Sequence, residues 1–279
     1  MNHSTFQMLL KELTNHAGSD LHLSRGFNPV IRQHGELVSM PGYPVLSDDD
    51  LFNIVKILLS EKQIYQLEEE RGYDLGYSST ENERFRINIY YERGALALAI
   101  RWLNGEILSV SEMNLPDQLN RLPTLRDGLV LMTGSTGSGK STTLASVINS
   151  INESRACHIL TIEDPIEFIH ENKQAVVHQR EIGTDARTFA EAMRGALRED
   201  PDVVLVGEMR DLETMRTALM VAETGHLVFS TLHTNDAVGV IDRMIGAFPG
   251  AEQDNVRAQL STVLRVVNRN SAIAFFVFY

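Results

Sequence analysis

The segment with the clearest chemical signature is Gly134-Ser-Thr-Gly-Ser-Gly139-Lys140-Ser141, which matches the pattern G-x-x-x-x-G-K-[ST]. It follows the apolar run 128–132 and precedes a helical run that begins near Thr142, which is the strand–loop–helix setting of a phosphate-binding loop. The glycines allow the backbone N–H groups to point at phosphate oxygens, and the helix N-terminus adds its dipole. The alternative is a Gly/Ser-rich turn that ends in a solvated lysine. It is disfavoured because the glycines, the lysine and the serine all stand at the positions that the motif requires.

This loop predicts a nucleotide site with Mg²⁺. Lys140 is expected to reach the β- and γ-phosphates, and the Ser141 hydroxyl is expected to ligate the metal. The predicted binding residues are Gly134, Ser135, Thr136, Gly137, Ser138, Gly139, Lys140, Ser141 and Thr142.

Two acids, Glu163 and Asp164, follow the apolar run 159–162 and stand directly before Pro165. Proline cannot continue the strand, so both carboxylates are expected at its C-terminal end, where open α/β sheets bind ligands. A carboxylate there can polarise water for attack on a γ-phosphate. The pair could also cap a turn. Beside a phosphate loop the functional interpretation is favoured for Glu163 and stays open for Asp164.

A second apolar strand runs from Asp202 to Val206 and ends in Gly207 and Glu208. It resembles a Walker B strand, which places an acid near Mg²⁺ and water. Gly207 stands where an aspartate is usual, so metal contact is assigned to Glu208, through water. Asp202, at the far end of the strand, fits a capping role at least as well as a functional one.

Histidines and arginines supply the remaining candidates. His226 and His233 flank the apolar stretch 227–232. His233 follows the stretch and is a candidate to sense the γ-phosphate or to relay a change to a neighbour. His226 fits a structural hydrogen-bonding role equally well. Arginines that can reach developing phosphate charge are Arg84, Arg86, Arg93 and Arg101 on a predicted hairpin and Arg194, Arg198 and Arg210 near the other motifs. Alternating hairpin arginines are typical of a solvated sheet face, and they become functional only if their domain covers the nucleotide.

Hydrophobic periodicity divides the chain into an α+β region and an α/β region. Before residue 103, the spacing predicts a helix around Phe6–Leu13, strands over 20–24 and within 30–38, a helix after Ser47 and a hairpin over 84–102. Beyond Gly128, apolar strands alternate with helices, which predicts a parallel, doubly wound sheet. The expected strands are 129–133, 158–162, 203–206 and 227–231, and the expected helices are 140–152, 187–198, 211–223, 236–247 and 260–267. The predicted domains are 1–103, a linker 104–126, 127–267 and a C-terminal tail 268–279.

Composition excludes several classes of protein. Lys and Arg total 25 and Asp and Glu total 37, which gives a net charge of −12 with no basic tract. Sequence-independent nucleic-acid binding requires such a tract, so it is disfavoured. The single cysteine, Cys157, excludes an internal disulfide framework and a CxxC zinc site. With no leader pattern and no run of about 18 apolar residues, a cytoplasmic protein is expected.

Five motifs in a fixed order resemble the secretion-ATPase superfamily and, within it, the type IV pilus retraction ATPases of the PilT family. They are GSTGSGKSTTLAS (134–146), HILTIEDPIEFIHE (158–171), QREIGTDARTF (179–189), ALREDPDVVLVGEMRDLETMRTAL (196–219) and AETGHLVFSTLHTN (222–235).

This resemblance implies a RecA-like P-loop ATPase core with a smaller N-terminal PAS-like α+β domain, assembled as a homo-hexameric ring that uses ATP and Mg²⁺. It assigns Glu163 as the catalytic glutamate, Glu208 as the Walker B glutamate and 226–233 as the histidine motif. Arg86, Arg93 and Arg101 are the matched hairpin arginines that contact nucleotide. The implied work is pilus retraction and twitching motility, with an inner-membrane platform protein and a paralogous pilus ATPase as partners and a peripheral position at the inner membrane.

Two features bear on the branch of the family. Extension ATPases usually carry a four-cysteine zinc motif, which a chain with one cysteine cannot build, so the retraction branch is favoured. The tail 268–279 departs from the family, and its apolar, β-prone end is expected either to mark a truncated product or to cover the chain's own core. Two alternative functions stay open: a non-hydrolysing or defective ring subunit that modulates a partner motor, and a nucleic-acid motor, which the net charge disfavours.

Overall fold

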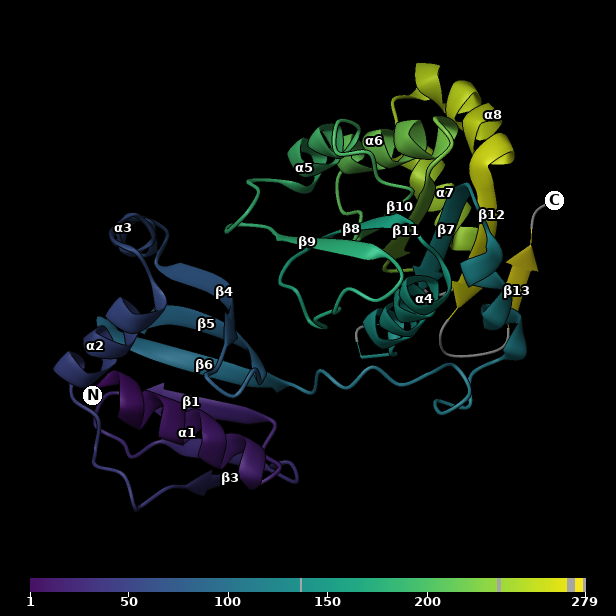
Figure 1. Ribbon diagram of the computed structural model, residues 1–279. Helices are drawn as coiled ribbons and strands as arrows, with labels where there is room; N and C mark the ends of the chain where they lie inside the picture. The colour runs from purple at the N-terminus through teal and green to yellow at the C-terminus, as the bar shows by residue number, and fades with distance from the viewer. Residues whose placement is uncertain (136, 235–236, 270–273, 278–279) are drawn as a thin grey trace. The chain divides into compact units, whose positions relative to one another are not determined.

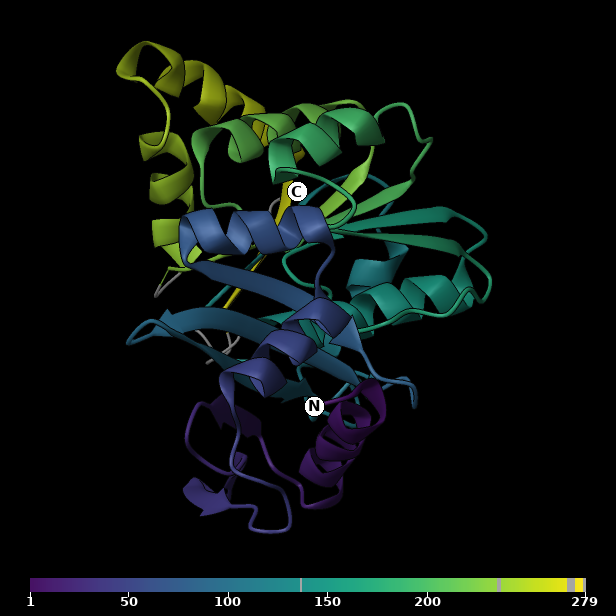
Figure 2. The same cartoon turned by 90° about the vertical axis from the view of Figure 1, so that its left-hand side faces the viewer.

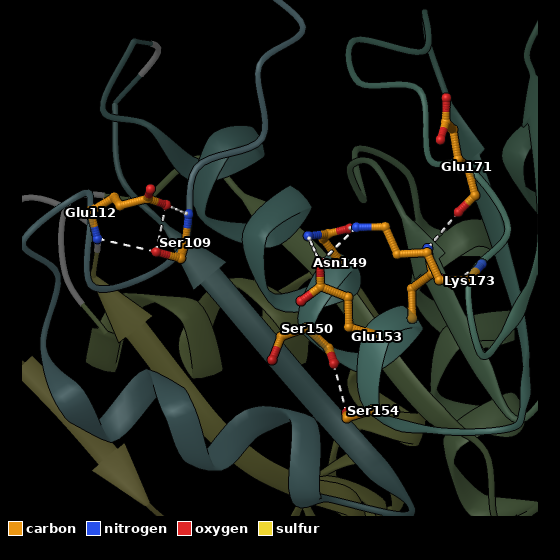
Figure 3. Close-up of polar contacts among 9 residues, drawn as sticks. Ser109, Glu112, Asn149, Ser150, Glu153, Ser154, Glu171 and Lys173 are labelled. Carbon is orange, nitrogen blue, oxygen red and sulfur yellow. Dashed lines mark hydrogen bonds and ion pairs between the residues drawn. The ribbon is translucent and has the colours of Figure 1, made fainter.

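Two sheets, each with its own helices, account for most of the chain in a computed structural model that describes residues 1–135, 137–234, 237–269 and 274–277 (Figure 1). The chain separates into the units Met1–Gly105 and Glu106–Tyr279. Most of the predicted linker 104–126 therefore groups with the second unit. Within it, Ser109 and Glu112 exchange hydrogen bonds (Figure 3), and the 3-10 helix η1 (Asp117–Thr124) buries Leu119 and Leu122.

The first unit is an antiparallel sheet in the order β3-β2-β1-β6-β5-β4. Its strands are β1 (Asp20–Ser24), β2 (Val30–Gln33), β3 (Glu36–Ser39), β4 (Gly72–Ser78), β5 (Arg84–Glu92) and β6 (Ala95–Leu103). Its helices are α1 (His3–Asn15), α2 (Asp48–Leu58) and α3 (Glu61–Glu70). Alternate residues of β5, such as Ile87 and Ile89, are buried in a core shared with α1 and α2, as expected for a sheet with one covered face. The predicted helices, strands and hairpin are present, and Ser47 caps α2. The periodicity did not predict α3 or β4.

The second unit is a sheet in the order β13-β12-β7-β11-β10-β8-β9, in which every neighbouring pair except β12–β13 is parallel. Its strands are β7 (Gly128–Thr133), β8 (His158–Glu163), β9 (Val176–Glu181), β10 (Val203–Val206), β11 (Leu227–Leu232), β12 (Leu264–Arg269) and β13 (Ala274–Val277). Its helices are α4 (Lys140–Ser154), α5 (Phe189–Ala196), α6 (Leu212–Glu223), α7 (Ala237–Gly246) and α8 (Gln253–Val263), with the short 3-10 helix η2 (Gly250–Glu252). Among the described residues, no helix has the length and apolar character needed to cross a bilayer.

Helices cover both faces of this sheet, which is why its strands are nearly continuous apolar runs. On β7, Leu129 and Leu131 join the core formed with α6 and α8, whereas Val130 and Met132 pack in the core formed with α4. In Figure 2 the green helices α5 and α6 lie above the sheet and the teal helix α4 lies below it. The predicted α/β class with a parallel sheet and an N-terminal α+β unit is confirmed.

The prediction of a helix over 260–267 is wrong for its second half. Helix α8 ends at Val263, and residues 264–269 form β12, which pairs in parallel with β7. Val266 and Val267 are β-branched and buried in the sheet, so tertiary pairing outweighs the helical spacing seen in the sequence. Within the predicted tail 268–279, residues 268–269 belong to β12 and 274–277 form β13 on its outer side, while 270–273 and 278–279 lie outside the described residues.

Gly128, the first residue of β7, gives the first testable prediction. Its φ is +96°, and a Cβ atom there would lie 2.6 Å from the carbonyl oxygen of Val263 and 2.6 Å from Cγ of Arg265. Because the Val263 oxygen is backbone, we expect Gly128→Ala to lower the free energy of unfolding by about 3 kcal/mol, from backbone strain and overpacking together. Urea denaturation measures this. Gly225→Ala is the matched control, since Gly225 has φ +91° but nothing within 4 Å of its Cβ position. If the two variants are equally stable, the close approach at Gly128 has no energetic effect.

Candidate functional site

The phosphate loop connects β7 to α4, at the C-terminal end of a central strand (Figure 1). Gly137 has φ +77° and Gly139 has φ +86°, a region that residues with a side chain rarely adopt, so these positions require glycine. Gly139 is the N-cap of α4, and among the described residues no side chain caps the N-terminus of this helix. The first N–H groups of α4 are therefore directed toward the loop, where an anion would accept their hydrogen bonds.

Lys140 folds back over the loop. The residue is only 8% exposed, and Nζ donates hydrogen bonds to the carbonyl oxygens of Gly134 and Ser135, each at 2.9 Å. Burial lowers the pKa of the Lys140 ammonium, and the charges of Glu208 and Glu167 act in the opposite direction. The structure thus places one ammonium group inside the curve of the loop, where the phosphates of a nucleotide would lie.

Ser141 lies at the start of α4 and lines a small cavity of about 30 Å³ together with Glu163, His170, Gly207 and Thr231. These residues come from five different segments of the second unit, and the parallel sheet brings them together at one edge. Of the other predicted loop residues, Thr142 is half-buried and Thr136 lies outside the described residues.

Glu163 ends β8, and its carboxylate is held by two side chains. Thr161 Oγ1 donates to Glu163 Oε1 at 2.6 Å, and Gln179 Nε2 donates to the same oxygen at 3.3 Å. Burial raises the pKa of Glu163 to about 7; the two donors lower it, and the charge of Glu167 raises it. A carboxyl group with a pKa near neutrality can accept a proton in one step and release it in another.

Glu208 follows β10 and meets the residue that follows the neighbouring strand β11. Its Oε2 lies 3.3 Å from Nε2 of His233 and 2.7 Å from Nε of Arg210. Gly207 packs against β8: a Cβ there would lie at ordinary contact distance, 3.4 Å from the Ile162 carbonyl oxygen and 3.5 Å from Cα of Glu163. Glu208, Arg210 and His233 therefore form one cluster of polar side chains beside the phosphate loop.

These residues fit Mg²⁺ held together with a nucleotide. The candidate ligands, the Ser141 hydroxyl and the Glu208 carboxylate, are hard oxygen donors of the kind that Mg²⁺ prefers. Among the described residues there is no cluster of three or more His, Cys, Asp or Glu side chains that would form an all-protein metal cage. Mg²⁺ usually takes one or two protein ligands and completes its shell with water and substrate phosphates.

Two residues whose role the sequence left open have structural partners. His226 lies at the opposite end of β11 from His233, and its Nδ1 is 3.0 Å from Thr224 Oγ1. Asp202 Oδ2 accepts a hydrogen bond from the backbone N–H of His158 at 2.8 Å. These contacts favour the structural interpretation of both. Asp164 is exposed beside Glu163.

The predicted arginines Arg86, Arg93 and Arg101 belong to the first unit. Arg101 Nε lies 2.8 Å from Asp20 Oδ1, and Arg86 and Arg93 lie 3.9 Å from Asp74 and Glu92. Each is near a carboxylate of its own unit, and their contact with nucleotide stays a prediction.

Sequence reasoning missed three residues of the site: Thr161, Gln179 and His170. A signal existed for Thr161, because residues i and i+2 of a strand share a face and Thr161 stands two before Glu163. Gln179 and His170 carried no such local signal, since the pairing of β8 with β9 and the path of the intervening loop bring them to Glu163.

Comparison with known proteins shows the family of this chain. The family model described as type II/IV secretion system protein matches residues 97–273. This chain belongs to that family. The type IV pilus retraction ATPase PilT of Pseudomonas aeruginosa is 44% identical over 93% of this chain and 75% of its own length. The twitching motility protein of Neisseria gonorrhoeae is 43% identical over 86% of this chain and 64% of its own length.

Solved structures of family members have the same fold. A crystal structure of the pilus retraction motor PilT with bound ADP matches with a TM-score of 0.89 and 45% identity, covering 94% of this chain and 77% of that one. The ATPase DotB of Legionella pneumophila matches with a TM-score of 0.88 and 30% identity, covering 96% of this chain and 76% of that one. Within the family, the chain is a PilT-like ATPase.

Proposed function

We propose that this chain is an ATP-hydrolysing motor subunit that powers type IV pilus retraction and twitching motility. The observation that carries the proposal is the meeting of Lys140, Glu163, Glu208 and His233 at one edge of the parallel sheet in a PilT-like chain. Phosphate-loop folds bind nucleotide at this edge.

In the proposed reaction, Lys140 and the loop N–H groups hold the phosphates, and Ser141 and Glu208 would hold Mg²⁺. Mg²⁺, when bound with ATP, neutralises charge on the β- and γ-phosphates. Glu163 takes a proton from a water molecule whose oxygen forms the new bond to the γ-phosphorus. The bond from that phosphorus to the bridging oxygen of ADP breaks, and ADP and inorganic phosphate leave. His233 senses the γ-phosphate through its contact with Glu208.

Assembly and partners are part of the proposal. We expect a homo-hexamer in which Arg86, Arg93 and Arg101 of the first unit approach a nucleotide, as cations often do in phosphoryl transfer. Proposed partners are an inner-membrane platform protein, which would hold the cytoplasmic ring at the membrane, and a paralogous pilus ATPase. The related sequence named type IV pilus ATPase PilU, 36% identical over 94% of this chain, makes the paralogue reasonable.

The test is Mg²⁺-dependent release of inorganic phosphate from ATP by this 279-residue chain, with Lys140→Ala as the inactive reference. Release that depends on Lys140 and Mg²⁺ supports the proposal. ATP binding without release would favour the alternative of a non-hydrolysing subunit that modulates a partner motor. Stimulation by DNA would favour a nucleic-acid motor, which the net charge of −12 disfavours.

The rate of hydrolysis should depend on the ionisation of Glu163. Its pKa of about 7 is raised by burial, so the carboxylate that acts as base is lost as the pH falls through 7. We expect kcat at saturating MgATP to be about tenfold lower at pH 6 than at pH 8. A pH series of kcat from 5.5 to 8.5, with folding checked by circular dichroism at each pH, measures this. A flat profile over that range would show that the base ionises at an ordinary carboxylate pKa.

A further inference from the structure

Gln179 contacts the candidate base and two groups of the loop that follows it. This residue lies on β9 and pairs in register with Thr161 on β8. Its Oε1 accepts a hydrogen bond from the backbone N–H of His170 at 2.8 Å. Its Nε2 donates to the carbonyl oxygen of Phe168 at 2.8 Å and to Glu163 Oε1 at 3.3 Å.

These partners fix the orientation of the amide. A backbone N–H can only donate and a backbone carbonyl can only accept, so Oε1 must face His170 and the NH₂ group must face Phe168. The second N–H of the same group is then directed at the Glu163 carboxylate. The amide cannot reverse without losing both backbone bonds at once.

A second donor converges on the same carboxylate oxygen, since Thr161 Oγ1 lies 2.6 Å from Glu163 Oε1. The register of β8 and β9 thus supplies two donors, from adjacent strands, to Oε1. His170 lines the same cavity, and burial lowers its pKa to about 4, so near neutral pH it adds no charge beside Glu163.

The loop 164–175 is also fastened at its other end, to the helix that follows the phosphate loop. Asn152 Nδ2 donates to the Glu171 carbonyl oxygen at 2.7 Å, and the Lys173 backbone N–H donates to Asn152 Oδ1 at 3.1 Å. Figure 3 shows Lys173 directed toward Asn149 and Glu153 of α4, with Nζ 3.0 and 2.6 Å from their side-chain oxygens. Near the base, the loop is held by Gln179 and by Glu181, whose Oε2 accepts from the Ile166 backbone N–H at 3.1 Å; of these two side chains, Gln179 is the one that also donates to Glu163.

We propose that Gln179 is a positioning residue for ATP hydrolysis: its amide holds the Glu163 carboxylate in one orientation and ties it to the loop 164–175. This inference rests on the proposed role of Glu163 as the base. Misplacement of a reacting group by about 1 Å lowers rates by about 100-fold in well-studied enzymes. A hydrogen-bond donor also stabilises the charged form of a carboxyl group, so its removal raises the carboxyl pKa.

The test compares Gln179→Glu and Gln179→Leu with the parent chain. The glutamate variant keeps an acceptor for the His170 N–H and replaces the donor toward Glu163 with a negative charge, whereas the leucine variant removes both functions. For each we expect kcat to fall roughly 10-fold, KM for ATP to change by less than about twofold, and the acidic limb of the pH profile to move to higher pH, further for the glutamate variant. Around Glu163, the described ionisable groups are Glu167 and His170 of the loop and its register neighbour Glu181 on β9. Lys140, Glu208 and His233 lie at the same sheet edge, and all six groups are unchanged in both variants.

Gln259→Leu is the matched control, because Gln259 also donates to a carboxylate, that of Glu223 at 3.1 Å, on an exposed surface. It should match the parent in kcat and in pH profile. The inference is overturned if either Gln179 variant keeps the parent kcat and acidic limb, or if kcat falls together with the melting temperature while the limb does not move. Glu163→Gln separates a failure of the proposed base from a failure of the proposed positioning residue. If this variant hydrolyses ATP at the parent rate, the assignment of Glu163 as the base is wrong. If it is inactive while Gln179→Leu is unaffected, only the role of Gln179 is rejected.

Discussion

Lys140→Ala is expected to lose both tight nucleotide binding and ATP hydrolysis. Lys140 places its ammonium inside the phosphate loop, where Nζ donates to two carbonyl oxygens, each at 2.9 Å. When ATP binds, this ammonium is available for the β- and γ-phosphates, whose charge grows during transfer. Removing one such preorganised charge lowers kcat by about 100-fold or more.

Nucleotide affinity from the fluorescence of a labelled ADP, together with phosphate release, checks this prediction. Lys11→Ala is the matched control, because Lys11 pairs with Glu81 on an exposed surface of the first unit, where ion pairs contribute little. It should leave binding and turnover unchanged. An alanine variant at 140 that binds ADP as tightly as the parent would mean that the loop backbone alone holds the phosphates.

Much of the second unit could be predicted because local sequence and tertiary structure agree there. The runs at 128–133 and 203–206 are buried on both faces, so they are apolar except for Thr133 and are recognisable as strands without their partners. The phosphate loop is specified within eight residues, since its glycines, lysine and helix start act together. At 264–267 local sequence and tertiary structure conflict. The helical spacing there predicts a helix, but these residues pair with β7 as a strand.

The contacts between motifs could not be predicted in the same way. Glu208 and His233 meet because β10 lies beside β11, and Gln179 reaches Glu163 because β9 lies beside β8 in one register. Strand order and register are set by packing of the whole sheet. A single sequence therefore shows which residues are candidates for the site, but not which of them contact one another. The pKa of Glu163 depends on the same long-range burial, which turns an ordinary glutamate into a group that titrates near pH 7.

Glu163→Gln is expected to abolish turnover while nucleotide binding persists. Glutamine has the size of glutamate and keeps an oxygen that accepts from Thr161, but it cannot take a proton from water. General-base catalysis contributes about 100- to 10,000-fold, so the residual kcat should fall within that range below the parent. The loop N–H groups and Lys140 are untouched, and affinity for ADP should therefore change by less than about twofold.

Because the glutamine side chain is neutral, a loss of folding is a poor explanation for lost turnover in Glu163→Gln. In the parent the fold raises the pKa of Glu163 from 4.5 to about 7, so the ionised carboxylate lowers stability increasingly as the pH rises through this range. Glutamine removes that penalty, and the variant should melt no lower than the parent at pH 8. Parallel measurement of phosphate release, ADP affinity and melting temperature therefore distinguishes a missing base from a damaged site. Full turnover by Glu163→Gln would transfer the role of base to another group at this sheet edge, and unchanged binding with lost turnover would leave Glu163 as the group that activates water.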